Sequence, residues 1–284
     1  MTKDRAASDS LVQDPDGGMD ALLEIMARLR DPTTGCPWDL VQTFGSIAPY
    51  TIEEAYEVAD AIERQAWGDL ESELGDLLLQ TVYHAQIGAE AGHFTFATIV
   101  RSIADKMLAR HPHVFGAANR DKTPQQQSAD WEAIKAGERA ARAESGTLDG
   151  IAIGLPALLR AVKLQTRAAR VGFDWPSTSE VLDKIVEETR ELVEARDSLT
   201  QTEVEEEFGD LLFVMANLAR HLQVDPEAAL RGANAKFTRR FTVIETELAK
   251  IGKRPEQSDL AEMDGLWIGA KTAEKAAKQA KKVP

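Results

Sequence analysis

The sequence predicts an all-α protein made of two tandem helical repeats, and two observations support this fold class. Segments between proline and glycine residues show the apolar periodicity of helices, and no segment has a convincing strand pattern. The second observation is an internal duplication, which indicates two related helical bundles. An E-E-x-x-E…E-x-x-D array occurs twice and aligns without a gap. The array comprises Glu53, Glu54, Glu57, Glu73 and Asp76 in the first repeat, and Glu187, Glu188, Glu191, Glu207 and Asp210 in the second.

The expected helices end near proline and glycine residues, because proline removes a backbone donor and glycine loses more entropy in a helix. Pro37, Gly92, Pro112, Pro156 and Pro226 are among these breakers. In the first repeat we expect helices over residues 19–30, 51–66, 69–91, 95–111 and 124–143. In the second repeat we expect helices over residues 156–170, 178–198, 202–223, 226–252 and 258–281.

Local composition divides the chain into four segments. Residues 1–17 are polar, and we expect them to form a disordered tail. Residues 18–143 are the N-terminal repeat, and residues 155–284 are the C-terminal repeat, which ends in a basic tail. Between them, residues 144–154 are small and rich in turn formers, so they are the expected linker.

Composition excludes several classes of partner. The chain has 284 residues, 43% of them hydrophobic, and a formal net charge of −14. Phosphate neutralisation needs a basic surface, so we expect no binding to nucleic acid and none to an anionic membrane. A single cysteine, Cys36, excludes an intramolecular disulfide, and the polar N-terminus lacks the apolar core of a signal peptide. We therefore expect a cytoplasmic protein.

The carboxylates of the second repeat are expected to lie on or beside buried apolar stripes. Glu207 falls inside one stripe and Asp210 at its edge, while Glu188 and Glu191 flank another. An unpaired buried carboxylate costs several kcal/mol, roughly, so such a cluster needs a compensating cation. The first stripe comprises Val204, Phe208, Leu211, Met215, Leu218 and Leu222, and the second comprises Leu182, Ile185, Val186, Thr189 and Val193.

The first repeat places Glu73 in a similar stripe, formed by Leu70, Leu74, Leu77, Leu78 and Thr81. Because all the candidate ligands are carboxylate oxygens, they favour Mg²⁺, with Mn²⁺ as a substitute, over zinc. Solvated acidic helix faces are the simpler explanation for other glutamates, but they do not explain Glu73 and Glu207. The expected metal ligands are Glu188, Glu191, Glu207 and Asp210, together with Glu54, Glu57, Glu73 and Asp76.

Basic and aromatic residues are duplicated as well. Lys106 and Arg110 match Lys236 and Arg240, and Trp131 and Lys135 match Trp267 and Lys271. Within each pair the residues are four positions apart, so they share one helix face. Cations beside a magnesium site suit a polyphosphate, and tryptophan offers a flat face to a nucleobase.

These residues, with the segments GCPWDLVQT, YTIEEAYEVADAI, ELGDLLLQTVYHA, RHPHVFG, WEAIKAGE, RAARVGFDW and NAKFTRRF, bring out a resemblance that covers nearly the whole chain beyond residue 17. The chain resembles the MazG family of bacterial nucleoside triphosphate pyrophosphohydrolases. The resemblance implies an all-α fold, a homodimer, and Mg²⁺-dependent hydrolysis of nucleoside triphosphates to monophosphate and pyrophosphate. It also implies that the two carboxylate motifs bind metal, that Lys236 and Arg240 hold phosphates, and that Trp267 and Lys271 bind the nucleotide.

The resemblance implies that the C-terminal repeat is the catalytic one. Its catalytic set would be Glu187, Glu188, Glu191, Glu207 and Asp210, with the general base either Glu187 or one of the four inner acids. The first repeat retains the same groups, but Gln80 and His84 replace Val214 and Leu218 and predict a more polar pocket.

Two alternatives stay open at this point. One keeps the chemistry but changes the substrate to dUTP, dCTP or phosphoribosyl-ATP. The other is a non-catalytic helical scaffold, which two complete carboxylate sets disfavour. His111 and His113 lie beside prolines, so we interpret them as parts of a helix-ending turn rather than as catalytic bases.

Overall fold

The computed structural model describes residues 5–117, 119–127, 130–131, 134, 137, 146–198 and 200–280. In these ranges all regular structure is helical and no strand is present, which confirms the predicted fold class. The chain divides into two compact units, Met1–Ile134 and Lys135–Pro284. The expected helix over residues 124–143 lies largely outside the described residues, although residues 124–127 are helical.

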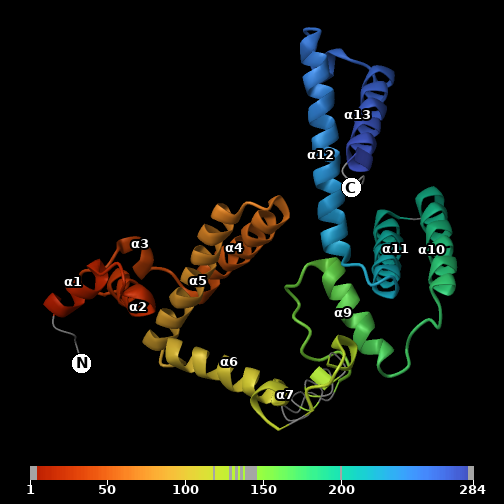
Figure 1. Cartoon of the computed structure of the whole chain (residues 1–284). Helices are drawn as coiled ribbons and strands as arrows, with labels where there is room; N and C mark the ends of the chain where they lie inside the picture. Colours follow the sequence, from red (N-terminus) through yellow and green to blue (C-terminus); the bar gives the residue numbers. More distant parts are fainter. Residues whose placement is uncertain are drawn as a thin grey trace. The chain divides into compact units, whose positions relative to one another are not determined.

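The first unit is centred on a hairpin of two long helices, α4 and α5 (Figure 1). Helices α2 and α6 pack against α5, and α1 packs against α2. The core between them contains Met26, Ile47, Val82, Tyr83 and Ile87. The elements of this unit are α1 (Arg5–Gln13), α2 (Gly18–Leu29), α3 (Pro37–Leu40), α4 (Phe44–Arg64), α5 (Trp67–Glu90), α6 (Phe96–Arg110) and α7 (Pro112–Phe115).

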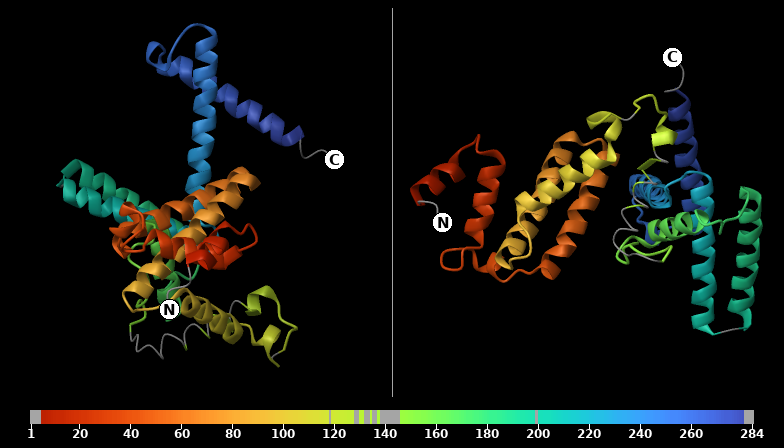
Figure 2. Two further views of the ribbon diagram at one scale, coloured as in Figure 1. Left: turned by 90° about the vertical axis from the view of Figure 1, so that its left-hand side faces the viewer. Right: turned by 90° about the horizontal axis from the view of Figure 1, so that it is seen from below.

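The second unit contains an equivalent hairpin, α10–α11, which Figure 2 shows from two further sides. Helix α9 packs against α11 and α12, and α12 pairs with α13. The elements are α9 (Ala157–Ala169), α10 (Thr178–Ser198), α11 (Gln201–His221), α12 (Pro226–Lys250), the 3-10 turn η1 (Pro255–Gln257) and α13 (Leu260–Ala280). None of the described helices in either unit is both long enough and apolar enough to span a bilayer.

Local sequence explains where the hairpin helices begin. Reciprocal capping boxes at Thr43 and Thr200 satisfy free backbone N–H groups at the starts of α4 and α11. Helix α4 therefore begins at Phe44, before the expected residue 51. Pro49 lies near the N-terminal end of α4, where its missing N–H removes a single helix bond and does not end the helix.

The expectation of disorder over residues 1–17 is wrong for residues 5–13, which form α1. Polar contacts, rather than apolar periodicity, hold this helix against α2. Arg28 donates from Nη1 to Asp9 Oδ1 at 2.6 Å and from Nε to Ser8 Oγ at 2.7 Å. Ser8, which is buried, also donates to Glu24. A search for apolar stripes misses a helix that is docked by hydrogen bonds.

The linker expected over residues 144–154 contributes turns that dock onto the second unit. Its described part begins at Gly146, whose N–H donates to Asp149 Oδ2 at 2.8 Å. Arg167 of α9 donates to the carbonyl oxygens of Thr147 and Asp149, at 3.4 and 3.2 Å. These bonds attach the described part of this segment to the second unit.

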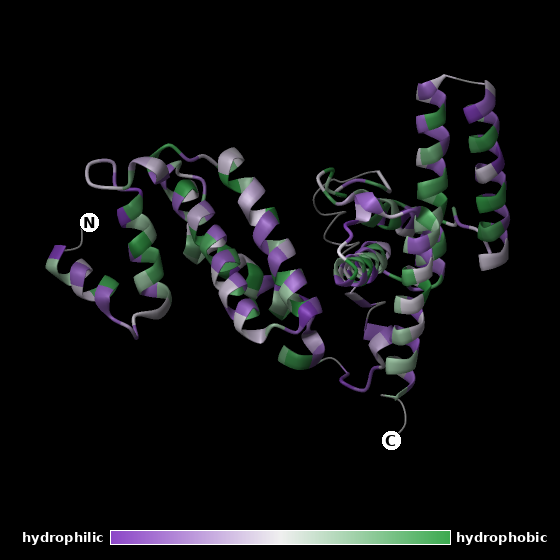
Figure 3. Ribbon diagram, turned by 90° about the horizontal axis from the view of Figure 1, so that it is seen from above, coloured by the Kyte–Doolittle hydropathy of each residue, from purple (hydrophilic) through white to green (hydrophobic). Residues whose placement is uncertain are grey.

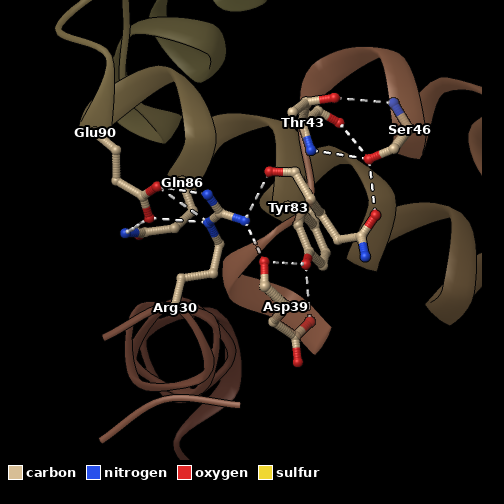
Figure 4. Close-up of polar contacts among 8 residues, drawn as sticks. Arg30, Asp39, Thr43, Ser46, Tyr83, Gln86 and Glu90 are labelled. Carbon is tan, nitrogen blue, oxygen red and sulfur yellow. Dashed lines mark hydrogen bonds and ion pairs between the residues drawn. The ribbon is translucent and has the colours of Figure 1, made fainter. Parts of the chain in front are cut away.

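A buried polar network ties α2, α3 and α5 together (Figure 4). Arg30 Nη2 lies 2.7 Å from Glu90 Oε2, and Arg30 Nη1 donates to the carbonyl oxygen of Asp39 at 2.5 Å. Tyr83 donates its hydroxyl to Asp39 Oδ1 at 2.8 Å. Burial is the main cause that raises the pKa of Tyr83 to about 12, so the hydroxyl keeps its proton. The G-C-P-W-D segment thus closes the core with a satisfied polar contact.

The apolar stripes expected to be buried on α10 and α11 are largely exposed within the chain, which corrects that prediction. Phe208 is 52% exposed and Val186 is 59% exposed, and Leu182, Val193, Met215 and Leu222 are exposed too. Leu74 and Leu78 of the first-repeat stripe are likewise exposed. Hydrophobic and hydrophilic residues are interspersed along the long helices (Figure 3), and α10 has both buried and exposed apolar residues. Only one face of this helix packs inside the hairpin.

Candidate metal and nucleotide sites

The packed face of α10 places a carboxylate in the middle of the hairpin interface. Val181, Glu188 and Ala195 are buried and recur every seven residues, which is the spacing of a helix seam. Glu188 is only 5% exposed. On α11, Glu207 is half-buried and Asp210 is exposed. Ligand oxygens of Glu188, Glu207 and Asp210 all lie within 4.8 Å of one another.

Glu191 and Glu187 lie at the margin of this group. Glu191 is close enough to act on Glu207: burial is the main cause that raises the pKa of Glu207, followed by the charges of Glu191, Asp210 and Glu188. Glu187 is exposed, and its Oε1 accepts a hydrogen bond from Lys184 Nζ at 2.7 Å. The structure thus brings together three of the four expected ligands of the second repeat, Glu188, Glu207 and Asp210. Glu191, the fourth, lies at the margin, and Glu187 lies outside the group.

The first repeat has a related group, with two acids from α4 and one from α5, and the fourth expected ligand, Asp76, lies outside it. Ile47 and Ala61 are buried on α4, with Glu54 halfway between them at the same seven-residue spacing. Oxygens of Glu54, Glu57 and Glu73 lie within 4.8 Å of one another. Burial, followed by the charge of Asp76, raises the pKa of Glu54. Burial, followed by the charges of Glu57 and Asp76, raises the pKa of Glu73.

The first site has a polar floor, as predicted. Gln80 is buried, and its Nε2 lies 3.5 Å from Glu54 Oε1. His84 Nε2 lies 3.1 Å from Thr51 Oγ1, and its ring stacks on Phe44 at 5.8 Å. Burial lowers the pKa of His84, which favours the neutral imidazole. At the corresponding position in the second repeat, Val214 is buried and apolar.

Both groups fit a hard divalent cation on chemical grounds. Each consists of carboxylate oxygens gathered from two helices, and in each the pKa of at least one acid is raised, first by burial and then by the charges of its neighbours. Ionised acids at this separation repel one another unless a cation lies between them. An all-oxygen set suits Mg²⁺ or Mn²⁺.

The basic and aromatic residues of the second repeat meet between α12 and α13. Arg240 lies over the ring of Trp267, with its Cζ 5.3 Å from the ring centroid, and Phe237 packs on the same ring at 5.4 Å. Glu274 Oε2 accepts hydrogen bonds from Nε and Nη2 of Arg240, at 2.9 and 2.8 Å. The structure therefore unites Arg240 with Trp267, a contact that spacing along single helices does not predict. Lys236 and Lys271 are exposed on the same two helices.

Within one chain, this α12–α13 cluster and the second carboxylate group are separate. Among the described residues, no ion pair or hydrogen bond joins Lys236 or Arg240 to Glu188, Glu207 or Asp210. Helix α12 packs on α9 and α13, and it rises away from the α10–α11 hairpin in Figure 1. Sequence spacing could not predict this separation.

In the first unit, the equivalent basic and aromatic residues meet at the end of α6. Trp131 Nε1 donates to the carbonyl oxygen of Arg110 at 3.1 Å, while Lys106 is half-buried on α6. Lys135 lies outside the described residues. His111 ends α6, its Nδ1 lies 2.8 Å from the Met107 carbonyl oxygen, and its ring packs edge-on against Trp131 at 5.3 Å. These contacts agree with the structural interpretation of His111.

Sequence reasoning missed two charged residues at these sites. Lys184 pairs with Glu188, and Glu274 pairs with Arg240. Lys184 precedes Glu188 by four residues, and Glu274 follows Lys271 by three, so helical spacing alone placed both on the relevant faces. Lys184 has no counterpart in the first repeat, because Tyr50 occupies the aligned position, so a comparison of the repeats does not reveal it.

Comparison with known proteins connects this geometry to a family. Residues 42–115 and 177–255 each match the MazG nucleotide pyrophosphohydrolase domain, and each segment contains one carboxylate group. The chain is 50% identical to the nucleoside triphosphate pyrophosphohydrolase of Escherichia coli (strain K12) over 258 residues, which cover 90% of this chain and 98% of that protein. It is 44% identical to the nucleoside triphosphate pyrophosphohydrolase/pyrophosphatase MazG of Thermotoga maritima over 250 residues, which cover 88% and 94%. It is 35% identical to a nucleoside triphosphate pyrophosphohydrolase of Mycobacterium tuberculosis over 170 residues, which cover 59% and 51%.

Proposed function

The chain belongs to the MazG nucleotide pyrophosphohydrolase family, and from this we infer that it hydrolyses nucleoside triphosphates to nucleoside monophosphate and pyrophosphate. The reaction is that of a hydrolase acting on phosphorus-containing anhydrides. The single observation that carries the inference is the group of converging carboxylates on the α10–α11 hairpin. We place the reaction there, with the first repeat in a mainly structural role.

We propose Mg²⁺ as the cofactor, with Mn²⁺ as a substitute. Glu188, Glu207 and Asp210 would hold the ion, and Glu191 would complete the set from the same face of α10. A bound divalent cation supplies charge neutralisation at phosphate oxygens and makes a bound water more acidic. In the first repeat, Glu54, Glu57, Glu73 and Asp76 would form the equivalent site.

The chain's own residues would bind the nucleotide and handle the proton. The guanidinium of Arg240 presents a planar fork that matches phosphate oxygens, and Lys236 adds a second cation on the same helix. Trp267 offers its ring to the base, with Lys271 beside it. A carboxylate outside the metal group, such as Glu187, would orient the attacking water and accept its proton.

We propose that the protein is a homodimer, because apolar faces of the α10–α11 hairpin lack a partner within the chain. The exposed large apolar side chains of this hairpin include Leu182, Val186, Phe208 and Met215. An exposed apolar face of this kind is typical of a protein interface. A second copy would also be able to bring an α12–α13 cluster to the carboxylate group.

Among the substrates left open above, nucleoside triphosphates are favoured over phosphoribosyl-ATP by the names of the relatives that match most of the chain. The scaffold alternative is disfavoured by the retention of Glu188 in a buried position, because a scaffold has no need of a buried acid. The cytoplasmic location stays a proposal, supported by the single cysteine, Cys36.

Purified protein with Mg²⁺ is expected to convert ATP, GTP, CTP, UTP and their deoxy forms to monophosphate and pyrophosphate. EDTA should abolish turnover, Mn²⁺ should restore it, and Zn²⁺ or Ca²⁺ should restore it poorly, because the ligands are all oxygens and Ca²⁺ prefers longer, more numerous contacts. Products should be identified by chromatography and by pyrophosphate detection. Release of nucleoside diphosphate and inorganic phosphate would contradict the proposed cleavage position. Turnover that EDTA does not reduce would contradict the proposed need for a divalent metal ion.

The dimer is tested by placing a charge on the unpaired apolar face. Phe208→Asp is expected to weaken self-association by more than about tenfold, since buried aromatic anchors dominate interface energies. Val41→Asp is the control, because Val41 is 72% exposed but lies in a turn after α3, in the other unit. Sedimentation velocity over a concentration series measures both, and a monomeric wild-type protein at micromolar concentration would contradict the proposal.

A further inference from the structure

We propose that Lys184 is an internal counterion of the second carboxylate group. Its ammonium pairs with Glu188 while no metal is bound, and this ion pair breaks when the divalent cation binds. Because the pair must break, Lys184 lowers the metal affinity of this repeat. The inference rests on the proposed metal-dependent function, which it deepens by naming what regulates metal occupancy at that site. Lys184 would be a positioning residue rather than a catalytic one.

The geometry places the ammonium of Lys184 directly on a ligand carboxylate. Lys184 Nζ lies 2.7 Å from Glu188 Oε1 and 2.7 Å from Glu187 Oε1. The Glu188 side chain is 6% exposed, and that of Lys184 is 28% exposed, so water screens this pair less than a surface pair. Hydrogen bonds to Glu187 and Glu188 raise the pKa of Lys184, and it stays charged at neutral pH. Of the three grouped ligands, Glu188 is the most buried and the one with a fixed cation.

The first repeat lacks this counterion. Tyr50 occupies the aligned position on α4, and its ring packs edge-on against Trp38 with centroids 6.4 Å apart. No lysine or arginine in the described part of the chain pairs with Glu54, Glu57 or Glu73. Instead, Gln80 offers a neutral amide to Glu54. The two groups therefore have similar ligand oxygens but differ by one positive charge.

One charge at this distance has a measurable consequence for cation binding. A divalent ion that reaches Glu188 must displace or repel the ammonium, and like charges a few ångströms apart interact strongly even in partly hydrated surroundings. Removing Lys184 should therefore increase metal affinity at the second group. Its presence would favour a readily exchanged ion at the repeat where we place turnover. It would also hold the Glu188 side chain in its observed orientation while no metal is bound.

The test measures Mn²⁺ binding by electron paramagnetic resonance without nucleotide, in protein that also contains Glu54→Gln and Glu57→Gln. These two changes weaken the first group, so the signal reports the second. Lys184→Met is expected to bind Mn²⁺ about tenfold more tightly than the Lys184 protein, while Lys184→Arg, which keeps the charge, stays within about threefold of it. The Mg²⁺ concentration for half-maximal turnover should fall in parallel.

A reciprocal substitution guards against a merely structural effect. Tyr50→Lys, in protein that contains Glu188→Gln and Glu191→Gln, is expected to weaken Mn²⁺ binding at the first group by about tenfold. Circular dichroism checks that α4 and α10 remain folded. Unchanged or weaker Mn²⁺ binding in Lys184→Met overturns this inference alone, whereas absence of Mn²⁺ binding in every protein overturns the proposed metal site as well. Because no nucleotide is present, loss of hydrolysis does not affect the binding result.

Discussion

Glu207→Gln is expected to abolish pyrophosphohydrolase activity while leaving helix content and self-association intact. Glu207 is half-buried beside Glu188 and Asp210, and an amide at this position removes one anionic ligand. Loss of a group that acts on transition-state charge costs about 10²–10³ in kcat. Asp210→Asn should behave in the same way. Steady-state kinetics with ATP and Mg²⁺ measure the loss, and turnover near that of the wild type would contradict our assignment of the second repeat as the active site.

The same variant is expected to be at least as stable as the wild type without metal. Folding raises the pKa of Glu207 above its ordinary value of 4.5, mainly through burial and then through its acidic neighbours. A raised pKa means that ionisation of Glu207 opposes folding once the pH exceeds the ordinary value, and the opposition is complete above the folded pKa. The melting temperature of Glu207→Gln should therefore match or exceed that of the wild type at pH 7, and the difference should vanish below about pH 4.5.

Glu206→Gln is the matched control for this prediction. Glu206 is exposed, belongs to the same turn of α11 and lies outside the grouped ligands. Its activity should stay close to that of the wild type, and its metal-free melting temperature should change little. A loss of activity equal to that of Glu207→Gln would mean that general negative charge on α11, rather than the grouped oxygens, is required.

Glu54→Gln with Glu57→Gln is expected to lower total turnover far less than Glu188→Gln with Glu191→Gln. Turnover should fall at least about a hundredfold in the Glu188→Gln, Glu191→Gln variant, and less than about fivefold in the Glu54→Gln, Glu57→Gln variant. The prediction rests on our proposal that the C-terminal repeat is the catalytic one, and on Gln80, which places a polar amide beside Glu54 in the first site. A hydrated, polar floor raises the effective dielectric constant and weakens electrostatic stabilisation of phosphate charge.

Paired kinetics with ATP, GTP and dUTP test this division of labour. Each double variant should also be compared with the wild type in sedimentation velocity, because the two repeats belong to one chain and a dimer would couple them. Equal losses in both double variants, with dimers intact, would mean that both repeats are catalytic. That result would contradict the mainly structural role proposed for the N-terminal repeat.

Much of the helical architecture and the identity of the grouped acids could be predicted from the sequence. Helix α10 begins at Thr178 and ends at Ser198, as its periodicity and flanking residues predict. The duplicated array predicted the two acidic groups, because carboxylates three or four residues apart share a helix face whatever the surrounding fold. The structure places Glu54, Glu57 and Glu73 together, and likewise Glu188, Glu207 and Asp210.

The direction in which each helix faces could not be predicted in the same way. Leu182 and Val186 formed an apparent core stripe, yet Val181, Glu188 and Ala195 line the hairpin interface. Both faces of α10 contain apolar residues, so a helical wheel identifies two candidates and cannot choose between them. Packing against α11 makes the choice, and the other face stays exposed within the chain.

By itself, the sequence determined the fold class, the duplication and the residue types of the carboxylate groups, because these depend on spacing along single helices. Tertiary structure alone decided that Glu188 is the most buried ligand, that Lys184 pairs with it, and that Arg240 lies over Trp267. It also decided that the Arg240 cluster and the carboxylates are apart within one chain. The physical reason is that contacts between helices depend on which faces meet. The free energy of helix packing is a sum over many weak apolar contacts, and local sequence does not reveal which of them form.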